Sequence, residues 1–168
     1  MITPSCDEIL KLAKEYTTIP VCREIYADMT TPIALLRRLQ TRSDRFFLLE
    51  SVEGGNLGRY SFLGYHPKLS VSCKNGVVKV KENGMVRILP GKPKEALQSL
   101  LEQYRSPQIE GLPTFTGGLV GYFAYETIQY AEPKLHIKQS DVNDFELMMF
   151  DKLLAFDQVM HKLCIIVN

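Results

Sequence analysis

The sequence predicts an α+β fold, in which antiparallel sheets carry helices inserted between their strands. Between residues 69 and 89, apolar residues alternate with polar ones in three short runs, which Asn75-Gly76 and Asn83-Gly84 separate. Asn-Gly favours a tight hairpin turn because both central residues of that turn need positive φ. Amphipathic segments with helix-capping residues lie before and after these runs. Consecutive antiparallel strands with inserted helices are typical of α+β domains.

The N-terminal region is expected to form two helices and one strand. Ser5 and Glu8 have the spacing of a capping box, and apolar residues follow at helical spacing, so a helix is predicted over residues 5–17. Residues 21–26 are rich in side chains that favour extended structure, which predicts a strand. A second helix is predicted from Thr31, because threonine is a good N-cap and the proline after it fits the first helical position.

Two strands are predicted on either side of a glycine-rich turn in the middle of the chain. Residues 46–49 are a continuous apolar run, as in a strand that is buried on both faces. Residues 53–58 form the turn, and a strand over residues 59–64 leads to the three alternating runs. A helix over residues 93–104 begins at a proline and has an apolar stripe of alanine and leucine.

The C-terminal region contains three apolar segments. A glycine-punctuated strand is predicted over residues 116–123, followed by a polar connector over residues 131–144. Residues 146–156 and 161–167 are expected to pair as a hairpin across Asp157-Gln158. The sequence stops at an apolar strand, which is an aggregation hazard when it is exposed. We therefore expect the chain to be a piece of a longer protein.

Composition and charge argue against several classes of protein. The chain has 168 residues, of which 45% are hydrophobic and 23% charged, as in ordinary globular proteins. Its net charge of +1 gives no field that would attract nucleic acid or an anionic membrane. We expect no signal peptide and no membrane helix, since the apolar runs are far shorter than ~20 residues. Four widely spaced cysteines without a CxxC pair indicate reduced thiols in the cytoplasm.

No complete catalytic or metal-binding set is apparent in the sequence. The glycines within residues 117–121 lack the lysine of a P-loop and the spacing of a dinucleotide-binding turn, so they are interpreted as structural. His161 and Cys164 are three residues apart in a predicted strand and would face opposite sides, which argues against a zinc site. The acidic stretch from Asp141 to Asp151 is interpreted as a solvated connector running into a strand.

The strongest candidate for a binding site is the segment from Leu48 to Ser51. Here a buried-looking strand delivers the Glu50 carboxylate and the Ser51 hydroxyl directly into the glycine-rich turn. Polar groups at the end of a buried strand can hold the amine and the carboxylate of a small ligand. The same two groups could instead satisfy the backbone of the turn, and the spacing alone favours neither interpretation.

Three motifs in order resemble the N-terminal region of anthranilate synthase component I, of the chorismate-utilising enzyme family. The first motif follows Thr31-Pro32, and the resemblance runs from about Pro20 to Asn168. The motifs are Phe47-Leu48-Leu49-Glu50-Ser51 with Gly58-Arg59-Tyr60-Ser61-Phe62-Leu63-Gly64, then Thr116-Gly117-Gly118-Leu119-Val120-Gly121-Tyr122-Phe123-Ala124-Tyr125-Glu126, then Phe150-Asp151-Lys152-Leu153-Leu154-Ala155-Phe156-Asp157. The Leu-Leu-Glu-Ser form is more similar to the anthranilate branch than to its sister, aminodeoxychorismate synthase component I.

The resemblance implies an α/β sandwich around antiparallel sheets, of which residues 1–168 would be the N-terminal domain. The complete enzyme, a lyase, would convert chorismate and ammonia to anthranilate and pyruvate at the start of tryptophan biosynthesis. The resemblance also implies Mg2+ as cofactor and a glutamine amidotransferase subunit, component II, as the partner that supplies ammonia. The chorismate and Mg2+ residues would lie in an absent C-terminal domain. This part alone is therefore expected to be inactive, with no catalytic residue and no metal ligand.

The resemblance further implies that this region carries part of the tryptophan feedback site, with L-tryptophan as an allosteric inhibitor. The site would be formed by Leu49, Glu50 and Ser51, with Arg59, Tyr60 and Ser61 lining or supporting the same pocket. Two alternatives stay open. One is a segment of aminodeoxychorismate synthase component I, and the other is a stand-alone amino-acid-binding module without catalysis.

Overall fold

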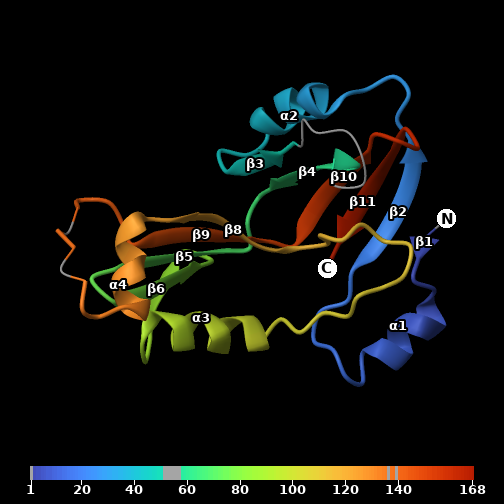
Figure 1. Cartoon of the computed structure of the whole chain (residues 1–168). Coiled ribbons are helices and arrows are strands. Elements are labelled where there is room, and N and C mark those ends of the chain that lie inside the picture. The colour runs from blue at the N-terminus through green and yellow to red at the C-terminus, as the bar shows by residue number, and fades with distance from the viewer. Residues whose placement is uncertain (1, 51–57, 136, 139) are drawn as a thin grey trace. The chain divides into compact units, whose positions relative to one another are not determined.

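The computed structural model confirms the α+β class and describes residues 2–50, 58–135, 137–138 and 140–168 (Figure 1). Within these residues the chain forms a six-stranded sheet, a five-stranded sheet and four α-helices. The chain divides into two compact units. The first unit contains residues 1–67, 104–118 and 150–168, and the second contains residues 68–103 and 119–149.

The six-stranded sheet belongs to the first unit, and strands that are distant in sequence lie side by side in it (Figure 1). Its spatial order is β1 (Ile2–Thr3), β2 (Val21–Tyr26), β11 (Lys162–Val167), β10 (Lys152–Asp157), β4 (Tyr60–Tyr65) and β3 (Phe46–Leu49). All neighbouring pairs are antiparallel, and the predicted hairpin between β10 and β11 is confirmed. Helix α1 (Cys6–Leu12) follows β1, and helix α2 (Pro32–Gln40) contacts β3 and β4.

The five-stranded sheet belongs to the second unit and contains the predicted meander. Its spatial order is β7 (Met85–Leu89), β6 (Val77–Glu82), β5 (Leu69–Lys74), β9 (Phe145–Phe150) and β8 (Gly118–Phe123). Both Asn-Gly turns are confirmed, because Asn75, Gly76, Asn83 and Gly84 all have positive φ, between 49° and 81°. Helix α3 (Pro93–Glu102) contacts β6, while the 3-10 helix η2 (Tyr125–Thr127) and helix α4 (Ile128–Ala131) follow β8.

The start of the first helix is confirmed, whereas its predicted length is wrong. Ser5 is the N-cap of α1, and its amide donates to the Glu8 carboxylate at 2.8 Å, as a capping box requires. The helix ends at Leu12 instead of continuing to residue 17. The amides of Thr17 and Thr18 donate to the carbonyl of residue 105 at 3.0 Å, so a distant segment takes the donors that a longer helix would use.

Two strand predictions need correction, one in its bounds and the other, whose strand β3 is confirmed, in its burial. The predicted strand over residues 146–156 is two strands, β9 and β10, which separate at Asp151 and join different sheets. The Asp151 carbonyl accepts from the Asn168 amide at 2.9 Å. The run over residues 46–49 is not buried on both faces, because β3 lies at the edge of its sheet and Leu49 is 49% exposed.

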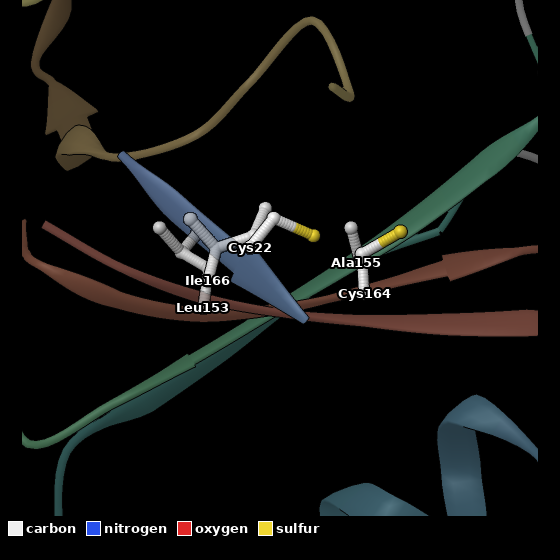
Figure 2. Close-up of a cluster of buried hydrophobic side chains, with 5 residues drawn as sticks. All are labelled: Cys22, Leu153, Ala155, Cys164 and Ile166. Atoms are coloured by element: carbon white, nitrogen blue, oxygen red, sulfur yellow. The ribbon is translucent and has the colours of Figure 1, made fainter. Parts of the chain in front are cut away.

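The two faces of the six-stranded sheet carry different layers. On one face, Phe156 and Leu163 pack with Leu35 of α2. The other face, which we call the aromatic face, has a core of five side chains from β2, β10 and β11, shown in Figure 2: Cys22, Leu153, Ala155, Cys164 and Ile166. The partly buried side chains that pack against this core are Phe47, Tyr60, Phe62, Leu112 and Phe115. Both cysteines in the core are free thiols.

Gly64 provides a test of the packing on the aromatic face. It lies opposite Phe47 in the pairing of β3 with β4, and a Cβ atom at this position would overlap the Phe47 ring. We expect Gly64→Ala to lower the free energy of unfolding by about 1–3 kcal/mol, because the ring must leave its edge-on contact with Phe150. Urea unfolding of the chain measures the change. In a Phe47→Leu background, Gly64→Ala should lower the free energy of unfolding by clearly less. An equal decrease in both backgrounds would exclude the overlap with the Phe47 ring as the cause.

Candidate functional site

The predicted site segment leads to the exposed edge of the aromatic face. Leu49, the last residue of β3, lies directly opposite Phe62 of β4, and Phe62 lies opposite Ala155 of β10. Directly opposite residues project to the same side of a sheet, so Leu49 and Phe62 share the aromatic face. Leu49 is half-exposed, Phe62 is half-buried, and Glu50, the next residue after the strand, is exposed.

Aromatic rings continue this surface along β4. The rings of Tyr60 and Phe62 lie on the same side of the strand, with their centres 5.9 Å apart. Phe62 also meets Phe115 edge to face at 5.5 Å, a geometry that the charge distribution of aromatic rings favours. Leu49, Tyr60, Phe62 and Phe115 are all incompletely buried, and we call these four residues the aromatic shelf. The shelf offers an apolar surface on which a flat ring can pack.

An ion pair borders the aromatic shelf. Arg59 donates from Nε and Nη2 to a single oxygen of Asp157, Oδ2, at 3.0 and 2.6 Å. Its guanidinium carbon lies 5.0 Å from the centre of the Tyr60 ring, in a cation–π contact. The side chain of Arg59 is 43% exposed, whereas that of Asp157 is 5% exposed. The positive charge beside the shelf is therefore accessible, and its negative partner is buried.

Hydrogen bonds hold the Asp157 carboxylate in its charged form. Its second oxygen, Oδ1, accepts from the amides of Val159 and Met160 at 3.0 and 3.1 Å. Burial acts to raise the pKa of Asp157, but the bonds from Arg59 and from these amides outweigh it and keep the pKa below its ordinary value. Burial, together with the Asp157 charge, raises the pKa of Tyr60.

The six residues that the sequence associated with one site have different positions. Leu49 and Tyr60 belong to the aromatic shelf, Glu50 adjoins it in sequence, and Arg59 borders it. Ser61 is fully buried and projects to the opposite face of β4, because neighbouring residues of a strand alternate. Ser51 lies outside the described residues.

Ser61 contributes to the same region through the turn that joins β10 to β11. Its hydroxyl accepts from the Gln158 side-chain amide at 2.8 Å. The Gln158 backbone amide also donates to the Arg59 carbonyl at 2.9 Å. Gln158 therefore holds the two residues on either side of Tyr60, at the start of β4.

This arrangement can bind a small ligand that carries a ring and two charged groups. The aromatic shelf can accept the ring, and the Arg59 guanidinium can accept an anionic group through charge-assisted hydrogen bonds. The exposed Glu50 carboxylate is a suitable partner for an ammonium group. A few polar groups beside an apolar surface are typical of small-molecule sites.

One residue of the acidic stretch from Asp141 to Asp151, Asp144, has a structural function. The Asp144 side chain is buried, and its Oδ2 accepts from the Tyr130 hydroxyl at 2.6 Å and from the Gly76 amide at 3.3 Å. The interpretation of this stretch as a solvated connector is therefore wrong at Asp144. Among the described residues, no group of three or more His, Cys, Asp or Glu could hold a metal ion.

The backbone of the fold accounts for Gly117 and His161, which the sequence analysis considered as possible ligand-binding residues. A Cβ atom at Gly117 would lie 2.7 Å from Asn168 Nδ2 and 3.1 Å from the Phe150 carbonyl oxygen, so this glycine permits a close approach of chain segments. His161 has positive φ in the turn before β11.

No helix in the described part of the chain is long and apolar enough to cross a membrane.

Sequence reasoning missed three parts of this arrangement. Tyr60 and Phe62 have the two-residue spacing of one strand face, and this signal was sufficient to include Phe62. Phe115 and Gln158 come from segments far along the chain, and no local pattern connects them with Leu49. Phe115 enters the arrangement by packing against Phe62, and Gln158 enters it through the pairing of β10 with β4.

Comparisons with known proteins identify relatives of the chain. It is 40% identical, over all of its length and 35% of the relative, to anthranilate synthase component 1 of Acetivibrio thermocellus. It is 36% identical to the same component of Synechocystis sp., over 97% of the chain and 33% of the relative. The solved structure of anthranilate synthase component I from Streptococcus pneumoniae TIGR4 matches with a TM-score of 0.54 and 25% identity, over 86% of this chain and 31% of that one.

No protein-family model matches the chain. The individual relatives nevertheless confirm the resemblance that the three motifs indicate. The chain spans 33–35% of the length of these two curated relatives.

The lowered pKa of Asp157 predicts a pH-dependent contribution to stability. A carboxylate with a lowered pKa stabilises the fold above its ordinary pKa of ~4, and this contribution is lost as the pH falls through the lowered value. We expect the free energy of unfolding of the wild-type chain to decrease more steeply between about pH 4 and pH 2 than that of Asp157→Asn. Urea unfolding at a series of pH values measures both slopes.

Asp151→Asn is the matched control for this experiment. It removes the carboxylate of another ion pair in the same unit, Asp151–Lys152, and should leave the pH dependence close to that of the wild type. Equal slopes for the wild type and Asp157→Asn would contradict the prediction.

Proposed function

Because the chain is homologous to the N-terminal third of anthranilate synthase component 1, we propose that it is the tryptophan-sensing part of such an enzyme. The observation that carries the proposal is the position of the Leu-Leu-Glu-Ser motif, because its second leucine, Leu49, is part of the aromatic shelf. Tryptophan has an indole ring, an ammonium group and a carboxylate. The shelf, Glu50 and Arg59 would each match one of these three features.

The proposed site combines shelf residues with the polar end of the motif. Leu49 and Tyr60 would line the indole, and Glu50 and Ser51 would bind the ammonium end of the ligand. Arg59 would bind the carboxylate, since its exposed guanidinium has donors that Asp157 does not use. Ser61 would support β4 from the opposite face through its bond with Gln158.

In the proposed complete enzyme, chorismate and ammonia react to give anthranilate and pyruvate. A glutamine amidotransferase subunit, component II, would release the ammonia from glutamine, and the enzyme would work in the cytoplasm in tryptophan biosynthesis. The resemblance implies Mg2+ for the complete enzyme, and the described part of this chain has no group of three or more His, Cys, Asp or Glu that could hold it. The reacting groups would belong to the rest of the enzyme.

Tryptophan would inhibit by favouring one of two conformations of the complete enzyme. A ligand shifts such an equilibrium only by its difference in affinity for the two states. The inhibited state would therefore be the one in which the ligand adds contacts with the rest of the enzyme to those with the shelf and with the polar groups beside it. This coupling requires no contact between tryptophan and the reacting atoms.

Ser51→Phe tests the proposed function. In the protein encoded by the complete reading frame, this exchange should raise the inhibition constant for tryptophan at least tenfold, because a large ring would occupy the space of the ligand's polar end. Anthranilate fluorescence measures turnover over a tryptophan titration, and pyruvate release confirms that the reaction is the anthranilate one.

Ser99→Phe is the matched control, since Ser99 is exposed on α3 in the second unit. This variant should be inhibited by tryptophan as the wild type is. Equal inhibition of Ser51→Phe and the wild type would rule out the assignment of Ser51, and turnover without pyruvate release would favour the aminodeoxychorismate branch.

A further inference from the structure

We propose that Asp157 and Gln158, in the turn between β10 and β11, are positioning residues for the tryptophan site. They fix the Arg59 guanidinium and the start of β4 beside the aromatic shelf, although neither is expected to touch the ligand. The inference rests on the proposed function. It extends that function to a turn that lies far from the Leu-Leu-Glu-Ser motif in the sequence.

The first step concerns the orientation of Arg59. Both of its bonds to Asp157 end on the same oxygen, Oδ2, so one edge of the guanidinium is held. An arginine side chain has five N–H donors, and the two bonds leave three of them. Among the described residues, Asp157 is the hydrogen-bond acceptor of Arg59, and the arginine side chain is 43% exposed. The arginine side chain is therefore partly open to solvent, from which an anionic group of a ligand can approach it.

The second step concerns the rigidity of Asp157 itself. Its Oδ1 accepts from the Val159 and Met160 amides, so the carboxylate is fixed to the backbone of the turn. Asp157 also pairs with Tyr60 on one side and with Lys162 on the other, as the last residue of β10. Because two amides hold its carboxylate and two strands pair with its backbone, Asp157 is a fixed anchor for the arginine.

The third step concerns the backbone of β4. Gln158 donates from its amide to the Arg59 carbonyl at 2.9 Å and from its side chain to the Ser61 hydroxyl at 2.8 Å. These bonds hold both residues that flank Tyr60. The turn therefore controls the backbone that carries Tyr60 as well as the charge of Arg59.

A comparison with another ion pair in the same sheet shows why this pair differs from an ordinary surface pair. Glu24 and Lys162 pair at 2.9 Å, and both side chains are partly exposed, at 43% and 29%. Exposed pairs of this kind contribute little to stability because water competes for both charges. In the Arg59–Asp157 pair the acid is buried and the base is accessible, which suits the presentation of a positive charge.

The consequence is a loss of tryptophan affinity when the anchor is removed. Without the Asp157 carboxylate, Arg59 is free to adopt many rotamers, and its ordering on binding then opposes association. We expect Asp157→Asn to raise the inhibition constant for tryptophan about tenfold in the complete enzyme. Asparagine keeps an oxygen that can accept from the turn amides, so the exchange is directed at the charge.

The experiment is a double-mutant cycle on the complete enzyme with its amidotransferase subunit. The tryptophan inhibition constant is measured for the wild type, Asp157→Asn, Arg59→Met and the double variant. If Asp157 acts through Arg59, the double variant should be no more resistant to tryptophan than Arg59→Met alone. A loss of general stability would instead add to the effect of Arg59→Met. Glu24→Gln, which removes the exposed pair of the same sheet, is the control and should keep the wild-type constant.

Gln158→Met provides a second variant that leaves the ion pair intact. It removes the side-chain bond to Ser61, keeps the backbone amide that donates to Arg59, and should raise the inhibition constant several-fold. Thermal unfolding of each variant shows whether it is folded at the assay temperature. If Asp157→Asn is unfolded there, Gln158→Met alone decides the role of the turn.

The possible results separate this inference from the proposed function. Wild-type inhibition constants in both Asp157→Asn and Gln158→Met, or additive effects in the cycle, would overturn the positioning role while Ser51→Phe still reports on the site. An unchanged constant in Arg59→Met would overturn it as well. An enzyme that tryptophan does not inhibit at all would overturn both the inference and the proposed function.

Discussion

The first unit depends on the pairing of β10, which lies between β4 and β11 in the six-stranded sheet. Through β11 the same strand connects to β2, so segments from the beginning, middle and end of the chain form one sheet. Arg59 and Asp157, which meet at the end of this pairing, are 98 positions apart. The entropy of closing such long loops opposes folding, and burial of apolar side chains on both faces of the sheet offsets it.

Once these strands are in register, the two-residue period of a strand decides which side chains meet. Leu49, Phe62 and Ala155 form one row across the sheet, and Tyr60 and Asp157 belong to the next row. The register thus places a carboxylate among apolar side chains, where an unpaired charge is costly. The bonds from Arg59 and from the turn amides compensate that cost. The position of the arginine beside the aromatic shelf follows from the burial of its partner.

Local patterns were sufficient to predict most of the fold, and distant contacts explain the rest. The Ser5 capping box and both Asn-Gly turns depend on neighbouring residues, and they are confirmed. The break at Asp151 coincides with the charged pair Asp151-Lys152, but the sequence does not show that the two halves join different sheets. The same reasoning applies to the site. Leu49 was predictable from its motif, whereas Gln158 acquires its partners only after β10 has paired with β4.

Under the proposed function, the first unit is better suited to hold an inhibitor than to change shape. The aromatic shelf lies on a hydrogen-bonded sheet with packed layers on both faces, and packed cores do not deform continuously. Inhibition nevertheless requires that tryptophan bind the two conformations of the enzyme differently. A rigid shelf supplies the same contacts in both, so the difference must arise from contacts between the ligand and the rest of the enzyme. Such a coupling would be reciprocal, so under this proposal chorismate would weaken tryptophan binding by the same factor by which tryptophan weakens the binding of chorismate.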